Sequence, residues 1–213
     1  MIVNDRIVSY IHSLEKENSR ILRELEEYAA KENVPIIRKE VESFLRVLLL
    51  ANKPKKILEL GTAIGYSAIL MSECIDEDGK IITIENYEKR IPIAKENIKK
   101  AEKENKIFLM EGDALEILPD LSEKFDFIFM DAAKAQYINF LPHTERLLKK
   151  GGLLLADNVL QEGEIIESRY AVGRRDRTIH SRMREFLYEI KHSENWETSI
   201  VPIGDGMTLS IRR

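Results

Sequence analysis

Two apolar runs in this sequence end on side chains that could bind a metal ion. The run GGLLLAD (151–157) ends on Asp157 and is followed by Asn158, and the run FDFIFMD (125–131) ends on Asp131. Aspartate and asparagine are common in turns, because their side chains bond the local backbone, so a turn is one interpretation of the Asp157-Asn158 pair. Carboxylate and amide oxygens at neighbouring strand ends would instead make an all-oxygen site that suits magnesium or calcium.

We favour the metal site, with Asp131, Asp157 and Asn158 as its ligands. Magnesium binds about six oxygens, so three from the protein leave room for two substrate oxygens and a water, as a catalytic site requires. Zinc is a poor fit, because the four histidines show no paired ligand spacing and Cys74 is the single cysteine of the sequence.

The composition is that of an ordinary soluble protein. The chain has 213 residues, of which 44% are hydrophobic and 33% charged, and this fits one domain with a proper core. A net charge of −4 provides no global attraction for nucleic acid. A lone cysteine fits a reducing cytosol, the first twenty residues are too charged for a signal peptide, and the apolar runs are too short for a bilayer. We therefore expect a cytoplasmic protein with no membrane segment.

The spacing of apolar residues predicts an α/β fold in a single domain. Three helical patterns predict an N-terminal helical cap over 1–52, and the remaining residues, 53–213, form the core. In the core, short apolar runs alternate with helical patterns, which indicates a mostly parallel sheet with helices on both faces. Gly204-Asp205-Gly206 predicts a final hairpin that adds two antiparallel strands at one edge, for seven strands in all. The expected parallel strands are 56–60, 80–85, 106–110, 125–131 and 151–157, and the expected core helices are 65–75, 87–104, 114–118, 135–149 and 178–192.

The first three strands lead to residues that suit a nucleotide ligand. In ELGTAIGYS, Gly61 and Gly65 would let the backbone approach a ligand at the start of a helix, although a plain strand-to-helix turn would also explain them. Glu85 ends the second strand, where it could accept hydrogen bonds from both hydroxyls of a ribose or be a solvated carboxylate. Asp113 could cap the short helix after the third strand or face an adenine amino group.

These motifs together resemble a known enzyme family. ELGTAIGYSA (59–68), Glu85, GDA (112–114), DAAKAQY (131–137) and ADN (156–158) are similar to motifs of the metal-dependent class I O-methyltransferases, the group of catechol and caffeoyl-CoA O-methyltransferases. The similarity covers nearly the whole chain in order. It implies a Rossmann-like class I methyltransferase fold, the cofactors S-adenosylmethionine and Mg²⁺, and a homodimer.

The resemblance also implies roles for individual residues. Asp131, Asp157 and Asn158 match the metal ligands, and Lys134 matches a lysine beside the reacting oxygen, where it would act as a base or hold the oxyanion. A surface lysine is the simple alternative for Lys134. One departure is that relatives often have Gly-Gln where this chain has Glu42-Ser43. The positions that match the S-adenosylmethionine site are Ile37, Gly61, Ser67, Glu85, Asp113, Ala114 and Asp131.

Within the family, the chain looks most similar to the bacterial tRNA 5-hydroxyuridine methyltransferases, which form 5-methoxyuridine. VPI (34–36), DNVL (157–160) and VPIGDGM (201–207) carry this similarity. The arginine-rich segment 169–184 agrees with this similarity, because the planar guanidinium group of arginine suits phosphates and a local cluster of positive charge would attract tRNA. A solvated helix face would also explain this segment. The predicted tRNA-binding residues are Arg169, Arg174, Arg175, Arg177 and Arg182.

Other functions account for less of the sequence. The alternative substrates within the family are small catechol-like phenols and CoA esters, for which magnesium would chelate two neighbouring oxygens in the same way. A Rossmann dehydrogenase would explain the sheet and Glu85, but not the three oxygen ligands or the glycine spacing. A non-catalytic binding protein would explain the arginines and leave Lys134 and the metal ligands without a role.

Overall fold

The computed structural model describes residues 3–213, and these residues divide into two compact units. The N-terminal unit comprises residues 6–114, and the C-terminal unit comprises residues 115–213 together with residues 3–5. The predicted single domain with a cap over 1–52 remains a prediction.

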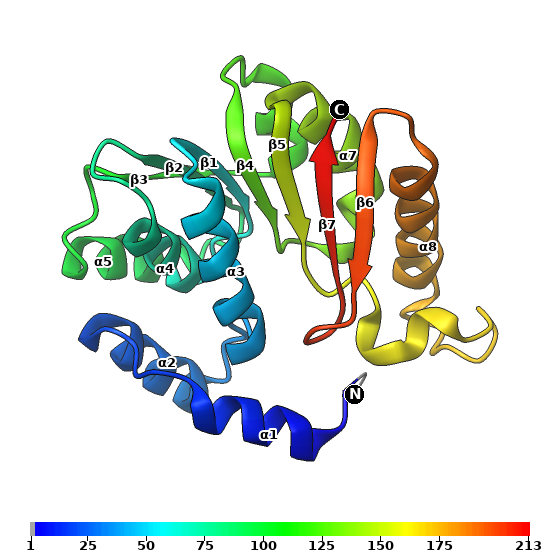
Figure 1. Ribbon diagram of the computed structural model, residues 1–213, viewed down its shortest axis with the longest axis horizontal. Coiled ribbons are helices and arrows are strands. Elements are labelled where there is room, and N and C mark those ends of the chain that lie inside the picture. The colour runs from blue at the N-terminus through cyan, green and yellow to red at the C-terminus, as the bar shows by residue number, and fades with distance from the viewer. Residues whose placement is uncertain (1–2) are drawn as a thin grey trace. The chain divides into compact units, whose positions relative to one another are not determined.

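The N-terminal unit contains three helices followed by alternating strands and helices (Figure 1). Its strands are parallel and lie in the order β3-β2-β1, with Leu60 of β1 opposite Ile84 of β2. Each predicted element of this unit is present, and its ends differ from the prediction by a few residues. The elements are α1 (Asp5–Leu14), α2 (Arg20–Glu32), α3 (Lys39–Asn52), β1 (Lys56–Leu60), α4 (Tyr66–Cys74), β2 (Lys80–Glu85), α5 (Ile91–Lys100), β3 (Ile107–Glu111) and α6 (Ala114–Ile117), the last of which crosses into the other unit.

Burial of apolar side chains holds the N-terminal unit together. Ile57, Leu58 and Leu60 of β1 are fully buried, and so is Glu59 between them, so both faces of this strand are covered. The helix α4 contacts α2, α3 and β2, so it lies between the first helices and the strands. This helix begins directly after the glycine loop that follows β1, and its packing therefore fixes that loop.

The C-terminal unit combines a parallel strand pair with an antiparallel hairpin. The strands lie in the order β4-β5-β7-β6; β4 and β5 are parallel, whereas β7 is antiparallel to both β5 and β6. The helix α7 contacts β4 and β5, and α8 contacts α7 and β6. This arrangement confirms the predicted hairpin around Gly204-Asp205-Gly206. The elements are η1 (Leu118–Asp120), β4 (Phe125–Met130), η2 (Lys134–Gln136), α7 (Tyr137–Leu147), β5 (Leu148–Ala156), η3 (Gln161–Ile166), α8 (Arg177–His192), β6 (Trp196–Val201) and β7 (Met207–Arg212).

The start of β5 differs from the prediction, which placed it at residue 151. The strand begins at Leu148, which lies opposite Phe125 of β4, and the register shifts between Phe125 and Phe127. Two lysines and two glycines follow Leu148, and Gly151 has a positive φ of 78°. This polar, irregular stretch lacks the apolar pattern of a strand, so the sequence does not predict its start. The shift in register lets the backbone pairing continue through it.

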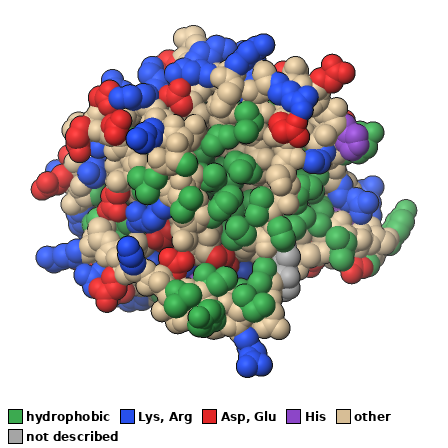
Figure 2. Space-filling view, in the orientation of Figure 1, with side chains coloured by type: hydrophobic (Ala, Val, Ile, Leu, Met, Phe, Trp, Pro, Cys, Tyr) green, Lys and Arg blue, Asp and Glu red, His purple; other side chains and the backbone are tan. Residues whose placement is uncertain are grey.

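Several helices leave large apolar side chains in contact with solvent. None of the residues of α1 is buried, and Ile7, Tyr10 and Leu14 are exposed along it, as are Val47 and Leu50 on α3. Figure 2 shows exposed hydrophobic side chains among the charged ones on one face of the molecule. Within residues 3–213, no helix is both long and apolar enough to cross a membrane.

Candidate active site

Glu85 lies at the carboxyl end of β2 with its carboxylate held in place by the backbone. Its Oε2 accepts a hydrogen bond from the Ala63 N–H at 2.7 Å, and its Oε1 accepts one from the Tyr87 N–H at 2.8 Å and a longer one from Asn86 at 3.1 Å. The residue is only 8% exposed. Because Oε2 accepts a single N–H, it keeps a lone pair that a ligand hydroxyl could use.

The loop between β1 and α4 has the backbone geometry that glycine allows. Gly61 and Gly65 have φ values of 98° and 87°, a region that other residues enter only with strain. Gly65 is the N-cap of α4, so the free N–H groups of the first helical turn follow it directly. The loop that contains Gly61 and Gly65 is joined to the Glu85 carboxylate through the Ala63 N–H, which brings these predicted site residues together.

Ser67 supports the site in a way that the motif did not predict. Its hydroxyl donates to Oε1 of Glu59 at 2.5 Å, and the Thr83 hydroxyl donates to Oε2 of the same carboxylate at 2.5 Å. Glu59 is fully buried at the end of β1. The Ser67 hydroxyl proton is thus bonded within the protein, and Glu59 is a buried acid for which the sequence predicted no role.

The other predicted cofactor positions in this unit are Asp113, Ala114 and Ile37. Asp113 is exposed and Ala114 begins α6, both just after β3, which pairs with β2 so that Glu111 lies opposite Glu85. Ile37 is buried in the segment between α2 and α3. The choice between a helix cap and an adenine contact for Asp113 therefore stays open.

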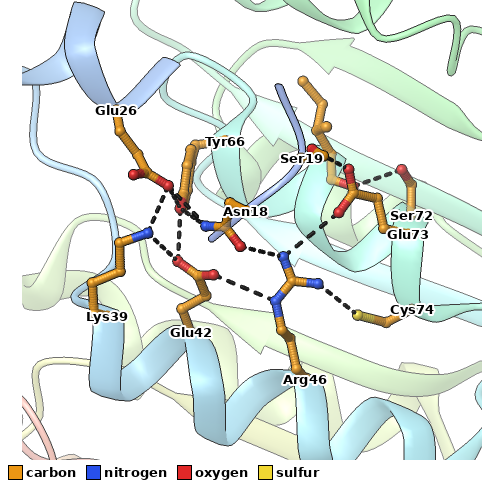
Figure 3. A network of polar contacts seen from close by, with 11 residues as sticks. Asn18, Ser19, Glu26, Lys39, Glu42, Arg46, Tyr66, Ser72, Glu73 and Cys74 are labelled. Atoms are coloured by element: carbon orange, nitrogen blue, oxygen red, sulfur yellow. Dashed lines mark hydrogen bonds and ion pairs between the residues drawn. The ribbon is translucent and has the colours of Figure 1, made fainter. Parts of the chain in front are cut away.

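A polar network anchors α4 to the helices that precede it (Figure 3). The Tyr66 hydroxyl lies 2.8 Å from Oε1 of Glu26 and 2.7 Å from Oε2 of Glu42, and Lys39 contacts both carboxylates at 2.6 and 3.3 Å. Burial alone would raise the pKa of Glu26, but hydrogen bonds led by that from Lys39 bring it below its usual value. Arg46 reaches Glu42 from the other side, with Nε 3.4 Å from Oε1. Glu42, which departs from the family pattern, is thus a buried carboxylate that forms ion pairs with both Lys39 and Arg46.

In the C-terminal unit, Asp131 and Asp157 follow the neighbouring parallel strands β4 and β5. The ends of these strands are in register, with Met130 opposite Ala156 and the Asp157 N–H bonded to the Met130 carbonyl at 3.0 Å. Asp157 is 2% exposed. Burial raises the pKa of both carboxyls, and for Asp157 the negative charge of Asp131 raises it further. A cation would relieve this repulsion, so the two carboxylates suit a metal ion.

Asn158 completes the predicted trio from a left-handed backbone conformation. Its φ is 59°, and its N–H donates to Oδ1 of Asp157 at 2.7 Å. Its side-chain Nδ2 donates to Oδ2 of Asp205 at 3.3 Å. Asp205 was interpreted from the sequence only as a hairpin residue, yet its charge also raises the pKa of Asp131 and Asp157. The pairing of β5 with β7 brings it to this site, and no short-range sequence signal reveals that.

Tyr137 joins the two strand ends and was likewise missed as a functional residue. Its hydroxyl, fully buried, lies 3.1 Å from the carbonyl of Met130 and 3.0 Å from that of Asp157. Its ring packs edge-on against Phe186 of α8, with the centroids 5.6 Å apart. The side chain therefore fixes the backbone on both sides of the two carboxylates.

Lys134 belongs to the same site. It opens η2, and its positive charge lowers the pKa of Asp131 and of Asp157, opposing the effect of burial. Nη1 of Arg182 bonds the carbonyl of the next residue, Ala135, at 3.2 Å and so holds this turn against α8. Within residues 3–213, no three His, Cys, Asp or Glu side chains form a metal-binding group, and the predicted trio contains only two such residues with an amide as the third.

The predicted tRNA-binding arginines fall into two groups. Arg169, Arg174 and Arg175 are exposed and have no hydrogen-bond or ion-pair partner among residues 3–213. Arg177 instead bonds the carbonyls of Val172 and Tyr170, and Arg182 supports the turn after Lys134. Three of the five side chains are thus available to an anionic ligand, and two hold the protein's own backbone.

Comparison with known proteins identifies the family. Residues 12–213 match the family model described as O-methyltransferase. This chain belongs to that family. It is 33% identical to a caffeoyl-CoA O-methyltransferase from Populus trichocarpa over 230 aligned positions, which cover 100% of this chain and 90% of the relative. A catechol O-methyltransferase from Niastella koreensis is 38% identical over 128 positions, covering 58% of each chain.

Solved structures confirm the predicted fold. A structure from Staphylococcus aureus, described as a candidate caffeoyl-CoA O-methyltransferase, matches with a TM-score of 0.90 and 33% identity over 97% of this chain and 99% of that one. A Bacillus cereus O-methyltransferase in complex with SAH matches with a TM-score of 0.86 and 26% identity over 98% and 97%. The Rossmann-like class I methyltransferase fold and the family membership are therefore confirmed, and the assignment of individual site residues remains a prediction.

Proposed function

We propose that this O-methyltransferase transfers the methyl group of S-adenosylmethionine to one of two adjacent oxygens of a phenolic substrate, with Mg²⁺ bound by Asp131, Asp157 and Asn158. The observation that carries the proposal is the pair of carboxylates that directly follow the neighbouring ends of β4 and β5, where Met130 lies opposite Ala156, with Asp157 buried and Asp131 partly buried. Their all-oxygen chemistry, with an amide beside them, fits magnesium. The family membership supports the methyl transfer.

S-adenosylmethionine is the proposed methyl donor. The fixed Glu85 carboxylate would accept a hydrogen bond from a ribose hydroxyl at Oε2, and the start of α4 provides N–H groups beside it. A relative that matches over 98% of this chain was solved with SAH, the product that remains after the methyl group leaves.

The reaction moves a methyl cation from the sulfonium to a substrate oxyanion, so a sulfur–carbon bond breaks as an oxygen–carbon bond forms and two opposite charges cancel. When bound, Mg²⁺ would lower the pKa of the substrate hydroxyl and fix its direction of attack. Lys134 would accept the hydroxyl proton or hold the oxyanion by its charge. Tyr137 would keep the ligand-bearing strand ends in a fixed geometry.

Small catechol-like phenols and phenolic CoA esters are the first candidate substrates, because the relatives named above act on caffeoyl-CoA or catechol. The exposed Arg169, Arg174 and Arg175 would suit the phosphates of CoA. The same arginines favour a second candidate, 5-hydroxyuridine in tRNA. Its 5-hydroxyl and the adjacent carbonyl offer the metal a similar pair of oxygens.

One assay separates these candidates. The protein, S-adenosylmethionine and MgCl₂ are incubated with catechol, caffeoyl-CoA, or tRNA that carries 5-hydroxyuridine, and the methylated products are measured by mass spectrometry. We expect turnover of a phenol or its CoA ester and none in EDTA; 5-methoxyuridine as the sole product would instead establish the tRNA function. Turnover undiminished in EDTA would refute the metal mechanism.

The role of the exposed arginines is tested by replacing Arg169, Arg174 and Arg175 with alanine. We expect a higher KM for the CoA ester or tRNA and an unchanged KM for free catechol, which has no phosphate. The matched control replaces Arg20, Arg23 and Lys31, which lie exposed on α2, with alanine. This control should change neither the KM for the CoA ester or tRNA nor the KM for free catechol. The predicted homodimer is checked by sedimentation of the same samples.

A further inference from the structure

Asp205 lies in a turn that is tightly bound to the segment carrying Asn158. The Val159 N–H donates to the Gly206 carbonyl at 2.8 Å, and the Leu160 N–H donates to the Asp205 carbonyl at 2.9 Å. Gly206 has a φ of 82°, and a Cβ there would lie only 2.3 Å from Cγ of Leu160. The backbone of this turn therefore has little freedom to move relative to Asn158.

The Asp205 carboxylate also sets which end of the Asn158 amide faces it. A carboxylate only accepts hydrogen bonds, so the group 3.3 Å from Asp205 Oδ2 is the amide Nδ2 rather than Oδ1. Without such a partner, the two ends of an asparagine amide are nearly equivalent and can exchange by rotation. With Nδ2 directed at Asp205, Oδ1 is the end left for a cation.

We propose that Asp205 is a positioning residue for the metal site: it holds Asn158 with the amide oxygen available for Mg²⁺ and adds a third negative charge beside Asp131 and Asp157. The inference rests on the proposed function, because it assumes that Asn158 is a metal ligand. Partners of this kind orient metal ligands in many sites, and their loss weakens metal binding by about 10- to 100-fold.

The test measures Mn²⁺ binding by electron paramagnetic resonance in the absence of substrate. Asp205→Asn removes the charge and keeps an acceptor of the same shape, whereas Asp205→Ala removes both. We expect about a 10-fold weaker Kd for Asp205→Asn and a larger loss for Asp205→Ala. The control is Asp120→Asn, which removes an exposed carboxylate before the amino end of β4 and should bind Mn²⁺ like the wild type.

A second readout follows the Asn158 side chain itself. In the metal-free protein, the Nδ2 hydrogens of Asn158 should give a resolved ¹⁵N–¹H signal that broadens or shifts in Asp205→Ala and not in Asp120→Asn. If Asp205→Ala does not fold, Asp205→Asn alone decides the metal affinity. Folded variants that bind Mn²⁺ within twofold of the wild type would overturn the role of Asp205 and leave the metal site intact. A wild type that binds no Mn²⁺ would overturn the proposed function together with this inference.

Discussion

Replacing Glu42 with alanine should destabilise the N-terminal unit substantially. The side chain of Glu42 is 7% exposed, and its two oxygens contact the Tyr66 hydroxyl at 2.7 Å, Lys39 at 3.3 Å and Arg46 at 3.4 Å. The change removes one anion and leaves two cations and a buried phenol without that partner. Lys39 keeps Glu26 at 2.6 Å, and Arg46 keeps Asn18 at 2.9 Å, so the network is weakened rather than abolished.

The magnitude follows from burial. Breaking a fully buried ion pair by removing one partner costs about 3–5 kcal/mol. Here the side chains of Lys39 and Arg46 are 34% and 27% exposed, so water can solvate both cations partly after the change. We therefore expect a loss of about 2–3 kcal/mol, which for a chain of this size lowers the unfolding temperature by roughly 5–10 °C. Glu42→Gln keeps an acceptor for Tyr66 and should cost less.

Urea and thermal unfolding followed by circular dichroism measure the effect. The matched control is Glu24→Ala, which removes the exposed i,i+4 pair of Glu24 with Arg20, where the side chains are 51% and 88% exposed. That change should cost less than about 0.5 kcal/mol. If Glu42→Ala and Glu24→Ala had the same small effect, the network in Figure 3 would not stabilise the protein and our reasoning would be wrong.

Three further predictions concern the site itself. In EDTA, the unfolding temperature of the wild type should fall between about pH 4 and pH 8 more steeply than that of Asp157→Asn. Burial and the charge of Asp131 raise the folded-state pKa of Asp157 to about 8, so the unfolded chain releases that proton first as the pH rises. MgCl₂ should remove this difference at high pH, and parallel curves in EDTA would contradict the prediction. Glu85→Ala should weaken S-adenosylmethionine binding by about 1.5–3 kcal/mol in calorimetry, as expected for hydrogen bonds to a charged group; an unchanged Kd would remove Glu85 from the site. Lys134→Ala should lower kcat although Mn²⁺ binds no more weakly than to the wild type, because the change removes a positive charge near Asp131 and Asp157; an equal kcat would show that Lys134 is only a surface residue.

The order of elements could be predicted from the sequence because it depends on local periodicity. Ile57 and Leu58 are adjacent apolar residues, so the strand lacks the strict alternation of a half-exposed strand, and the structure buries both of them together with Leu60. The positions of Asp131 and Asp157 could also be predicted from the sequence, because neighbouring parallel strands place their carboxyl ends at one edge of the sheet. The start of β5 at Leu148 could not be predicted from the sequence, because the next residues are lysines and glycines whose pairing depends on a register shift.

The supporting residues could not be predicted, because their partners lie far away in the sequence. Glu42 meets Tyr66 across 24 residues and Asn158 meets Asp205 across 47. Each of these side chains alone has an ordinary explanation, such as an exposed helix position or a hairpin turn. The bond of the Ser67 hydroxyl to Glu59 could not be predicted from the motif either, and the position of Ser67 beside the cofactor stays a prediction.

The C-terminal unit by itself contains every side chain proposed to bind the metal, and this has a physical consequence. Two carboxylates with raised pKa values are costly to keep together, and an adjacent third, Asp205, increases that cost. Hydrogen bonds to the backbone hold the carboxylates in place despite their repulsion. The Tyr137 hydroxyl bonds the carbonyls at both strand ends, and two backbone hydrogen bonds fix the Asp205 turn against Val159 and Leu160. A turn alone would not require the carboxylates of Asp131, Asp157 and Asp205 to lie close together. The arrangement is therefore better explained by a cation than by chain reversal.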